Sequence, residues 1–145
     1  MDRTPDSTPA RARPARILVA EDDLEMRRLV VESLQADGHE AVDVMDGGQL
    51  LVQLTSFDRL VAEPIDLIVT DIRMPAPSGL EIVQTLREAE WKTPIVIMTA
   101  FGDPETRARA RSLGAVLLEK PFKMRTLRGI VRALLRGTIP GDAPL

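Results

Sequence analysis

The 145-residue sequence contains no cysteine and no tyrosine, and it lacks long apolar runs. Without cysteine, the chain can form neither a disulfide scaffold nor a metal site with thiolate ligands. Its longest uninterrupted apolar runs are about four or five residues, whereas a membrane-spanning helix needs roughly 20. The N-terminus also lacks the apolar core of a signal peptide. We therefore expect a cytoplasmic protein that does not bind a membrane.

Apolar residues nevertheless make up 44% of the chain, a share typical of globular proteins, and the length fits one domain. The two ends differ from the rest. Residues 1–15 combine arginine with proline, serine and threonine, and residues 137–145 are rich in glycine and proline. Such segments bury too little apolar surface to become ordered. We predict a disordered N-terminal tail over 1–15, one domain over 16–136, and a disordered tail or linker over 137–145.

Charge is distributed unevenly along the sequence. The net charge is −3, and the first sixteen residues hold four arginines and two aspartates, so the remainder carries −5. An acidic domain is a poor partner for nucleic acid, and we expect no direct DNA binding by this chain. For the arginine-bearing N-terminal segment, a contact with a phosphate backbone stays open as the alternative to a simple flexible tail.

Five short segments carry strand patterns. Four are uninterrupted runs rich in branched side chains: Ile17–Ala20, Leu67–Thr70, Ile95–Met98 and Ala115–Leu118. Such runs are typical of strands covered on both faces, as in a parallel sheet. The fifth segment, Ala41–Val44, contains a charged residue between apolar ones, which suits an edge strand.

Amphipathic helix patterns separate these strands, at residues 26–34, 50–61, 82–86 and 127–135. The segment from Asp103 to Leu113 is different. Asp103 is a suitable N-cap with Pro104 at the first helical position, but the arginines and alanines that follow offer little apolar surface, so we predict a loosely held helix. Alternating strands and helices predict a doubly wound α/β fold with a five-stranded parallel sheet.

Chemically active side chains follow four of the predicted strands. In chain order, Glu21, Asp22 and Asp23 follow the first predicted strand, Asp71 follows the third, Thr99 follows the fourth, and Lys120 lies just beyond the fifth. The carboxyl ends of parallel strands meet at one edge, where ligands bind in open α/β sheets. Charged residues can simply end strands, but carboxylates, a hydroxyl and an ammonium at four strand ends favour a functional site.

The residue types at this edge indicate its chemistry. Carboxylates held close together repel one another, so a proton or a cation must join them. All the candidate ligands are oxygens, which favours Mg²⁺ over Zn²⁺. A metal ion, a lysine and a hydroxyl around one carboxylate are the groups needed to stabilise a transferring phosphoryl group. Asp71 is expected to be ionised and can act as the nucleophile.

The sequence resembles the receiver domain of bacterial two-component response regulators. The resemblance covers residues 16–136 and is carried, in order, by Val19–Asp23, Thr70–Pro75, Ser78–Gly79, Met98–Ala100 and the stretch from Gly114–Ala115 to Lys120–Phe122. Each motif is weak alone, but the ordered set is specific. It implies a flavodoxin-like sheet with strand order 2-1-3-4-5.

The resemblance also implies a role for each residue at the edge of the sheet. For the metal, Asp22 is similar to the direct Mg²⁺ ligand beside the acceptor, Glu21 to the acid that often reaches Mg²⁺ through water, and the main-chain carbonyl of Arg73 to a further ligand. Asp71 takes part as well, and Asp23 would be a third acidic member beside Glu21 and Asp22.

For the phosphoryl group, Asp71 resembles the acceptor, Thr99 the hydroxyl that moves to contact it, and Lys120 the lysine that pairs first with the acceptor and then with the phosphate. The Lys120–Pro121 peptide bond is expected to be cis, a form found in only about 5–6% of X-Pro bonds.

The implied function is a signalling switch. A sensor histidine kinase or a phosphotransfer protein would donate the phosphoryl group, and the domain would catalyse its own phosphotransfer and slow autodephosphorylation without being a turnover enzyme. The output would be read on the surface of the fourth helix, fifth strand and fifth helix. The output partner is not evident from the sequence, and a homodimer is left open.

Two rival functions fit parts of the pattern. A pseudo-receiver would be a binding module of the same fold, but the acidic residues, Thr99 and Lys120 are all present here. A phosphatase with an aspartyl nucleophile generally needs a second acid two residues further on, where this chain has Arg73. Mass spectrometry after treatment with acetyl phosphate separates the three functions.

The chain departs from the family pattern twice. Leu117 stands where the family usually has tyrosine or phenylalanine, so the ring that changes rotamer on activation is missing. We predict that phosphorylation instead moves residues 100–113 with Thr99 as the lever. The segment from Asp46 to Asp71 is also longer than usual, which predicts a longer second helix or, alternatively, a partner-specific surface.

Other residues receive structural interpretations. His39 is expected to be a solvated turn residue, Trp91 to contribute to packing, and Met26 and Met98 to belong to the core. The arginines of the last helix are expected to form a solvated face, with a partner surface as the alternative; they are Arg125, Arg128, Arg132 and Arg136.

Overall fold

The computed structural model describes residues 14–54, 64–75 and 77–137. In chain order, the elements are β1 (Arg16–Ala20), α1 (Leu24–Ala36), β2 (Glu40–Val44), α2 (Gly47–Leu54), β3 (Leu67–Asp71), α3 (Gly79–Glu88), β4 (Ile95–Thr99), α4 (Pro104–Ser112), β5 (Val116–Glu119) and α5 (Met124–Leu135). The predicted tails fall mainly outside the described residues, as do Phe57 and Val61 of the predicted longer second helix.

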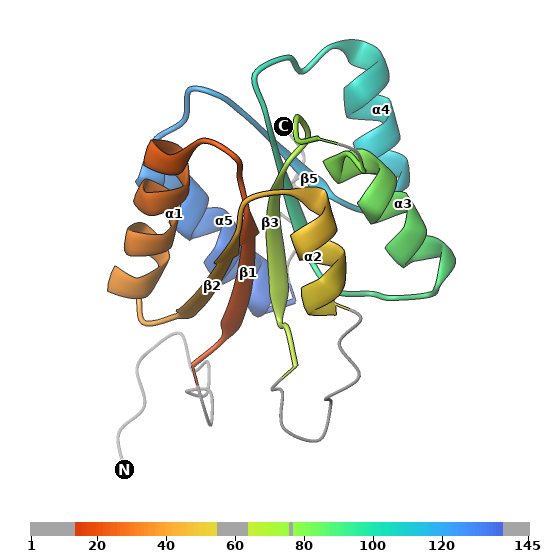
Figure 1. Cartoon of the computed structure of the whole chain (residues 1–145). Helices are drawn as coiled ribbons and strands as arrows, with labels where there is room; N and C mark the ends of the chain where they lie inside the picture. The colour runs from red at the N-terminus through yellow and green to blue at the C-terminus, as the bar shows by residue number, and fades with distance from the viewer. Residues whose placement is uncertain (1–13, 55–63, 76, 138–145) are drawn as a thin grey trace.

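The sheet has five parallel strands in the order β2-β1-β3-β4-β5, which confirms the predicted fold and strand order. The register pairs Ala20 with Val44 on one side and with Thr70 on the other. It also pairs Asp71 with Met98 and Thr99 with Glu119. The last residues of β1, β3, β4 and β5 therefore lie side by side at one edge (Figure 1).

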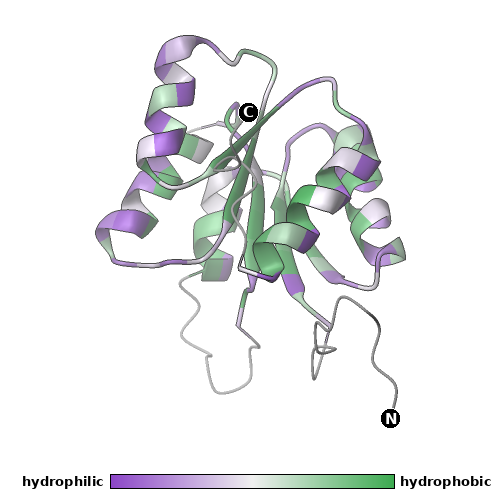
Figure 2. Ribbon diagram, turned by 180° about the vertical axis from the view of Figure 1, so that it is seen from behind, coloured by the Kyte–Doolittle hydropathy of each residue, from purple (hydrophilic) through white to green (hydrophobic). Residues whose placement is uncertain are grey.

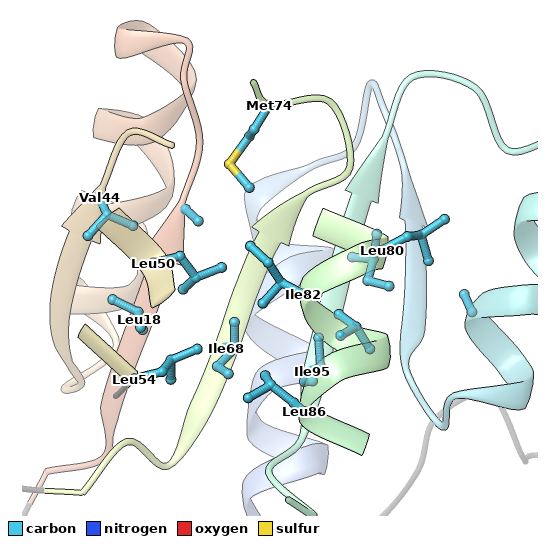
Figure 3. Close-up of a cluster of buried hydrophobic side chains, with 14 residues drawn as sticks. Leu18, Val44, Leu50, Leu54, Ile68, Met74, Leu80, Ile82, Leu86 and Ile95 are labelled. Carbon is cyan, nitrogen blue, oxygen red and sulfur yellow. The ribbon is translucent and has the colours of Figure 1, made fainter. Parts of the chain in front are cut away.

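Helices cover both faces of the sheet (Figure 1). On one face α2, α3 and α4 pack on a buried cluster that includes Leu18, Leu50, Ile68, Ile82 and Ile95 (Figure 3). On the other face α1 and α5 enclose a second cluster, to which Ile17, Val30, Val69, Met98 and Leu127 belong. Figure 2 shows apolar residues concentrated on the strands and on the inward sides of the helices.

Short polar signals fix where α1 and α3 begin. The Asp23 side chain accepts a hydrogen bond from the Met26 amide at 2.8 Å and caps α1. Ser78 and Glu81 form a capping box at the start of α3. Because each cap satisfies amides that have no partner within the helix, it stabilises the first turn. After α1, Gly38 adopts φ +91°, a left-handed conformation that glycine takes without strain and that lets the chain turn away from the helix.

The fourth and fifth helices are held very differently. Among the residues of α4 only Ala110 is buried, although Asp103 caps the helix and Pro104 opens it as predicted. By contrast, α5 buries Leu127, Val131 and Leu134. The prediction that α4 has few apolar anchors is therefore confirmed.

The structure corrects two predictions, one about His39 and one about the arginines of α5. His39 is not a solvated turn residue, because its side chain is only 12% exposed and its Nε2 atom lies 3.7 Å from Asp37 Oδ2. The arginines of α5 are only partly a solvated face. Arg132 donates to both carboxylate oxygens of Asp37, at 2.8 and 2.5 Å, and Arg128 donates to the Ser33 hydroxyl at 2.7 Å. These contacts join the two helices, which the sequence could not reveal.

Trp91 and Met98 behave as predicted, whereas Met26 is only partly buried and is not a core residue. Trp91 is partly buried and packs against the cluster under α2 and α3, Met98 is fully buried, and Met26 packs at the edge of the second cluster. Within the described part of the chain, every helix is too short or too polar to cross a bilayer.

Candidate functional site

The carboxyl edge of the sheet brings together the side chains that the sequence singled out. Asp71 is the last residue of β3 and Thr99 the last of β4, while Glu21 follows β1 and Lys120 follows β5 directly. Glu21, Asp71 and Thr99 are buried, with exposed fractions of 0%, 5% and 2%. Buried polar groups of this kind need partners, and the geometry supplies them.

Three carboxylates form the acidic part of the site. Glu21, Asp22 and Asp71 each offer an oxygen, and these oxygens all lie within 4.8 Å of one another. Asp22 is exposed whereas the other two are buried, so the group opens to solvent on the Asp22 side. Asp23 lies outside this group and is occupied in capping α1. The donor set consists only of oxygens and fits a hard divalent cation.

Lys120 supplies the positive charge. Its Nζ atom lies 2.9 Å from Glu21 Oε1 and 3.2 Å from Asp71 Oδ2. Its amide donates to the Thr99 carbonyl at 2.7 Å, and the peptide bond to Pro121 is cis, as the resemblance implied. Burial alone would lower the pKa of Lys120, but the hydrogen bond to Glu21 and the charges of Asp71 and Glu21 outweigh it and raise the pKa. The lysine is therefore firmly protonated.

Burial has the opposite effect on Glu21. It raises the pKa of this carboxyl group from 4.5 to about 7, and the nearby negative charge of Asp71 adds to the rise. The hydrogen bonds that Glu21 accepts from Lys120 and from the Asp23 amide oppose the rise without cancelling it. At neutral pH a proton and a metal cation would therefore compete for the Glu21 carboxylate.

The backbone around Asp71 is tightly packed. The Arg73 amide donates to Asp71 Oδ1 at 3.1 Å. At Gly79, the first residue of α3, a Cβ atom would lie 2.3 Å from the Asp71 carbonyl oxygen. Only glycine permits this approach, so the start of α3 packs directly against the main chain that carries Asp71.

Thr99 is turned toward its own loop. Its Oγ1 atom accepts from the Phe101 amide at 3.0 Å and donates to the Phe101 carbonyl at 3.2 Å. Leu117, which replaces the usual aromatic residue, lies on β5 opposite Ile97. It packs against the first buried cluster, the one that includes Leu18 and Ile82.

Two contacts beside the site were not predicted from the sequence. The Arg73 guanidinium lies 4.2 Å from the centroid of the Phe101 ring, and Arg107 pairs with Glu119 at 2.6 Å. Arg73 and Phe101 each lie two residues beyond a strand end, at Asp71 and Thr99 on neighbouring strands. That equal spacing is the signal that could have indicated their contact.

Comparison with known proteins agrees with this geometry. The family model of the response regulator receiver domain matches residues 17–132. The response regulator MprA of Mycolicibacterium vanbaalenii is 35% identical over 130 residues, which are 89% of this chain and 54% of that protein. The transcriptional regulatory protein CpxR of Escherichia coli K12 is 34% identical over 122 residues, 83% of this chain and 49% of that protein. The chain thus spans about half the length of these relatives.

Solved structures show the same fold. The chemotaxis response regulator CheY4 of Vibrio cholerae matches with a TM-score of 0.72 and 28% identity over 83% of this chain and 98% of its own. A response regulator receiver protein from Pseudomonas putida matches with a TM-score of 0.73 and 28% identity over 85% of this chain and 98% of its own. With the acids, threonine and lysine gathered at the carboxyl edge of a 2-1-3-4-5 sheet, the chain belongs to the receiver domains of two-component response regulators.

Proposed function

We propose that Asp71 accepts a phosphoryl group and that the domain over residues 16–136 works as a phosphorylation-controlled switch. The observation that carries the proposal is the environment of the Asp71 carboxylate. It is buried, lies 3.2 Å from the Lys120 ammonium and shares a group of oxygens with Glu21 and Asp22. A permanent cation and a cation-binding group around one carboxylate are what phosphoryl transfer to an aspartate requires.

The donor we propose is a phosphohistidine of a sensor histidine kinase or of a phosphotransfer protein. An Asp71 carboxylate oxygen attacks phosphorus, the new O–P bond forms as the P–N bond to the donor breaks, and the imidazole leaves with the bonding electron pair. The Arg73 amide and Lys120 hold the carboxylate in place, at 3.1 and 3.2 Å. Slow hydrolysis of the acyl phosphate would reset the switch.

The acidic group fits Mg²⁺, because its ligand atoms are all oxygens and its negative charge is only partly balanced by Lys120. The residues that would hold the ion are Asp22 and Asp71 directly, Glu21 in part through water, and the main-chain carbonyl of Arg73. Bound there, Mg²⁺ would supply positive charge for the phosphoryl oxygens.

We further propose that the signal leaves through α4, β5 and α5. Thr99 would release Phe101 and turn toward the phosphoryl group, and the loop that leads into α4 would follow. Because α4 buries only Ala110, its position costs little to change. Residues 137–145 would act as a tail or as a linker, and a homodimer through this surface is one arrangement that would read the signal.

The decisive experiment is intact-protein mass spectrometry after incubation with acetyl phosphate and Mg²⁺. The wild-type chain should gain one phosphoryl group, and Asp71→Asn should gain none. Excess EDTA should abolish labelling of the wild-type chain. Undiminished labelling of Asp71→Asn would refute the acceptor, full labelling in EDTA would refute the metal requirement, and an unlabelled wild-type chain would favour a binding module that is not phosphorylated.

A further inference from the structure

The loop between β4 and α4, residues 100–103, holds Thr99 in its present orientation. The Thr99 hydroxyl is bonded to the amide and carbonyl of Phe101, at 3.0 and 3.2 Å. In the proposed function this hydroxyl contacts the phosphoryl group, so it must first leave Phe101. The contacts that hold the loop in place therefore contribute to the free-energy difference between the two orientations of Thr99.

The end of β5 contacts this region at two positions, through its backbone at Thr99 and through the Glu119 side chain at Gly102. Glu119 is paired in register with Thr99, and the next amide, that of Lys120, donates to the Thr99 carbonyl at 2.7 Å. The Glu119 side chain then lies across Gly102: a Cβ atom at Gly102 would lie 1.8 Å from Glu119 Oε1 and 2.6 Å from Cδ. The strand residue that precedes the loop, Thr99, is thus held by β5, and the Glu119 carboxylate lies against Gly102 near the end of the loop.

The same carboxylate reaches the helix that follows. Glu119 Oε1 accepts a hydrogen bond from Arg107 Nη2 at 2.6 Å. Because α4 buries only Ala110, this ion pair and the hydrogen bond from Arg109 to Gln84 on α3 are side-chain contacts that help to attach the helix. Both side chains are exposed, Arg107 by 59% and Glu119 by 47%, so the pair is weak enough to break reversibly.

We propose, on the basis of the function proposed above, that Glu119 is a positioning residue for Thr99. By pairing with Arg107 and lying over Gly102, it holds the β4–α4 loop in the position that keeps the Thr99 hydroxyl away from Asp71. A charged contact at the end of β5 therefore restrains the switch in a domain whose Leu117 carries no ring. Loosening the contact should favour the phosphorylated state.

The test uses beryllofluoride with Mg²⁺ as a stand-in for the phosphoryl group, and measures its dissociation constant for the full chain by NMR titration. Arg107→Gln removes a positive charge, and electrostatics alone would weaken binding of an anion. The proposal predicts the opposite, roughly two- to fivefold tighter binding, because a surface ion pair of ordinary strength is released. Gly102→Ala leaves every charge in place and displaces the flexible Glu119 side chain, so it should act in the same direction.

Two matched variants control for charge. Arg111→Gln, one turn further along α4, removes the same charge from an exposed position and should not tighten binding. The double variant Arg107→Gln/Gly102→Ala should bind like the tighter single variant, because both changes release the same contact. Without ligand, the Phe101 amide should exchange hydrogen faster in Arg107→Gln and Gly102→Ala than in wild type, since its acceptor Thr99 is freed.

Each outcome decides a separate claim. If wild type binds beryllofluoride, Asp71→Asn does not, and both Arg107→Gln and Gly102→Ala match wild type in affinity and Phe101 exchange, Glu119 does not position Thr99 and the proposed function stands. Weaker binding by Arg107→Gln together with unchanged Gly102→Ala would show that only charge matters. If Asp71→Asn binds as tightly as wild type, both the function and the inference are wrong.

Discussion

Without Mg²⁺, the buried carboxyl group of Glu21 should make the protein less stable as the pH rises from 5 to 8. Its pKa is about 7 in the folded protein, against an ordinary value of 4.5, and burial is the main cause. Between these values the folded chain keeps a proton that the unfolded chain releases. The unfolded state then binds fewer protons, so the free energy of unfolding falls as the pH rises and levels off above 7. One pKa unit corresponds to about 1.36 kcal/mol, so the rise from 4.5 to about 7 makes the full loss about 3 kcal/mol.

The assay is urea unfolding of the full chain in EDTA at several pH values, for wild type and Glu21→Gln. Glutamine does not titrate, so the free energy of unfolding of the variant should not fall with pH as that of wild type does. The variant should therefore become the more stable protein, by about 3 kcal/mol at pH 8. Glu105→Gln, an exposed change on α4, is the control and should follow wild type. Parallel curves for wild type and Glu21→Gln would refute the assignment of this pH dependence to Glu21. Added Mg²⁺ should stabilise wild type more at pH 8 than at pH 5.

Further predictions concern residues around Asp71. In Mg²⁺ titrations, Asp22→Ala should weaken binding far more than Asp23→Ala, which should instead lose about 1 kcal/mol of stability because it removes the cap of α1; equal loss of Mg²⁺ affinity would contradict this. Gly79→Ala places a Cβ atom 2.3 Å from the Asp71 carbonyl oxygen, and should cost about 1–3 kcal/mol in urea unfolding and slow labelling by acetyl phosphate. Gly129→Ala, where a Cβ atom meets nothing within 4 Å on α5, should instead stabilise by about 0.5–1 kcal/mol; a destabilised Gly129→Ala would contradict the packing there.

Much of this fold could be predicted because its signals are local. Uninterrupted runs of apolar residues with branched side chains predicted four strands. The less apolar segment Ala41–Val44 predicted the edge strand β2 (Glu40–Val44). Parallel topology then brought Glu21, Asp71 and Lys120 together without further information, since the carboxyl ends of such strands share an edge. Element ends were less certain: the fifth strand begins at Val116, one residue later than predicted.

The predictions that failed depend on contacts between distant parts of the chain. His39 is enclosed beside Asp37, and Asp37 is held by Arg132, which lies 95 residues away in sequence. Nothing near Asp37 in the sequence signals that Arg132 will bind it. The pair of Arg107 and Glu119 likewise needs the docking of α4 on β5. Helix periodicity shows which side of a helix is polar, but not which charged groups a neighbouring element brings to it.

The unequal anchoring of α4 and α5 matters to anyone who would build a sensor from this domain. Three buried side chains and two arginine contacts fasten α5 to the body of the protein. A fluorophore attached there should report little. A dye on the outward side of α4, near Arg111, would sit on the element with the weakest attachment, where a small free-energy change becomes a large change in environment. The same asymmetry recommends α5 as the place to tether the protein to a surface.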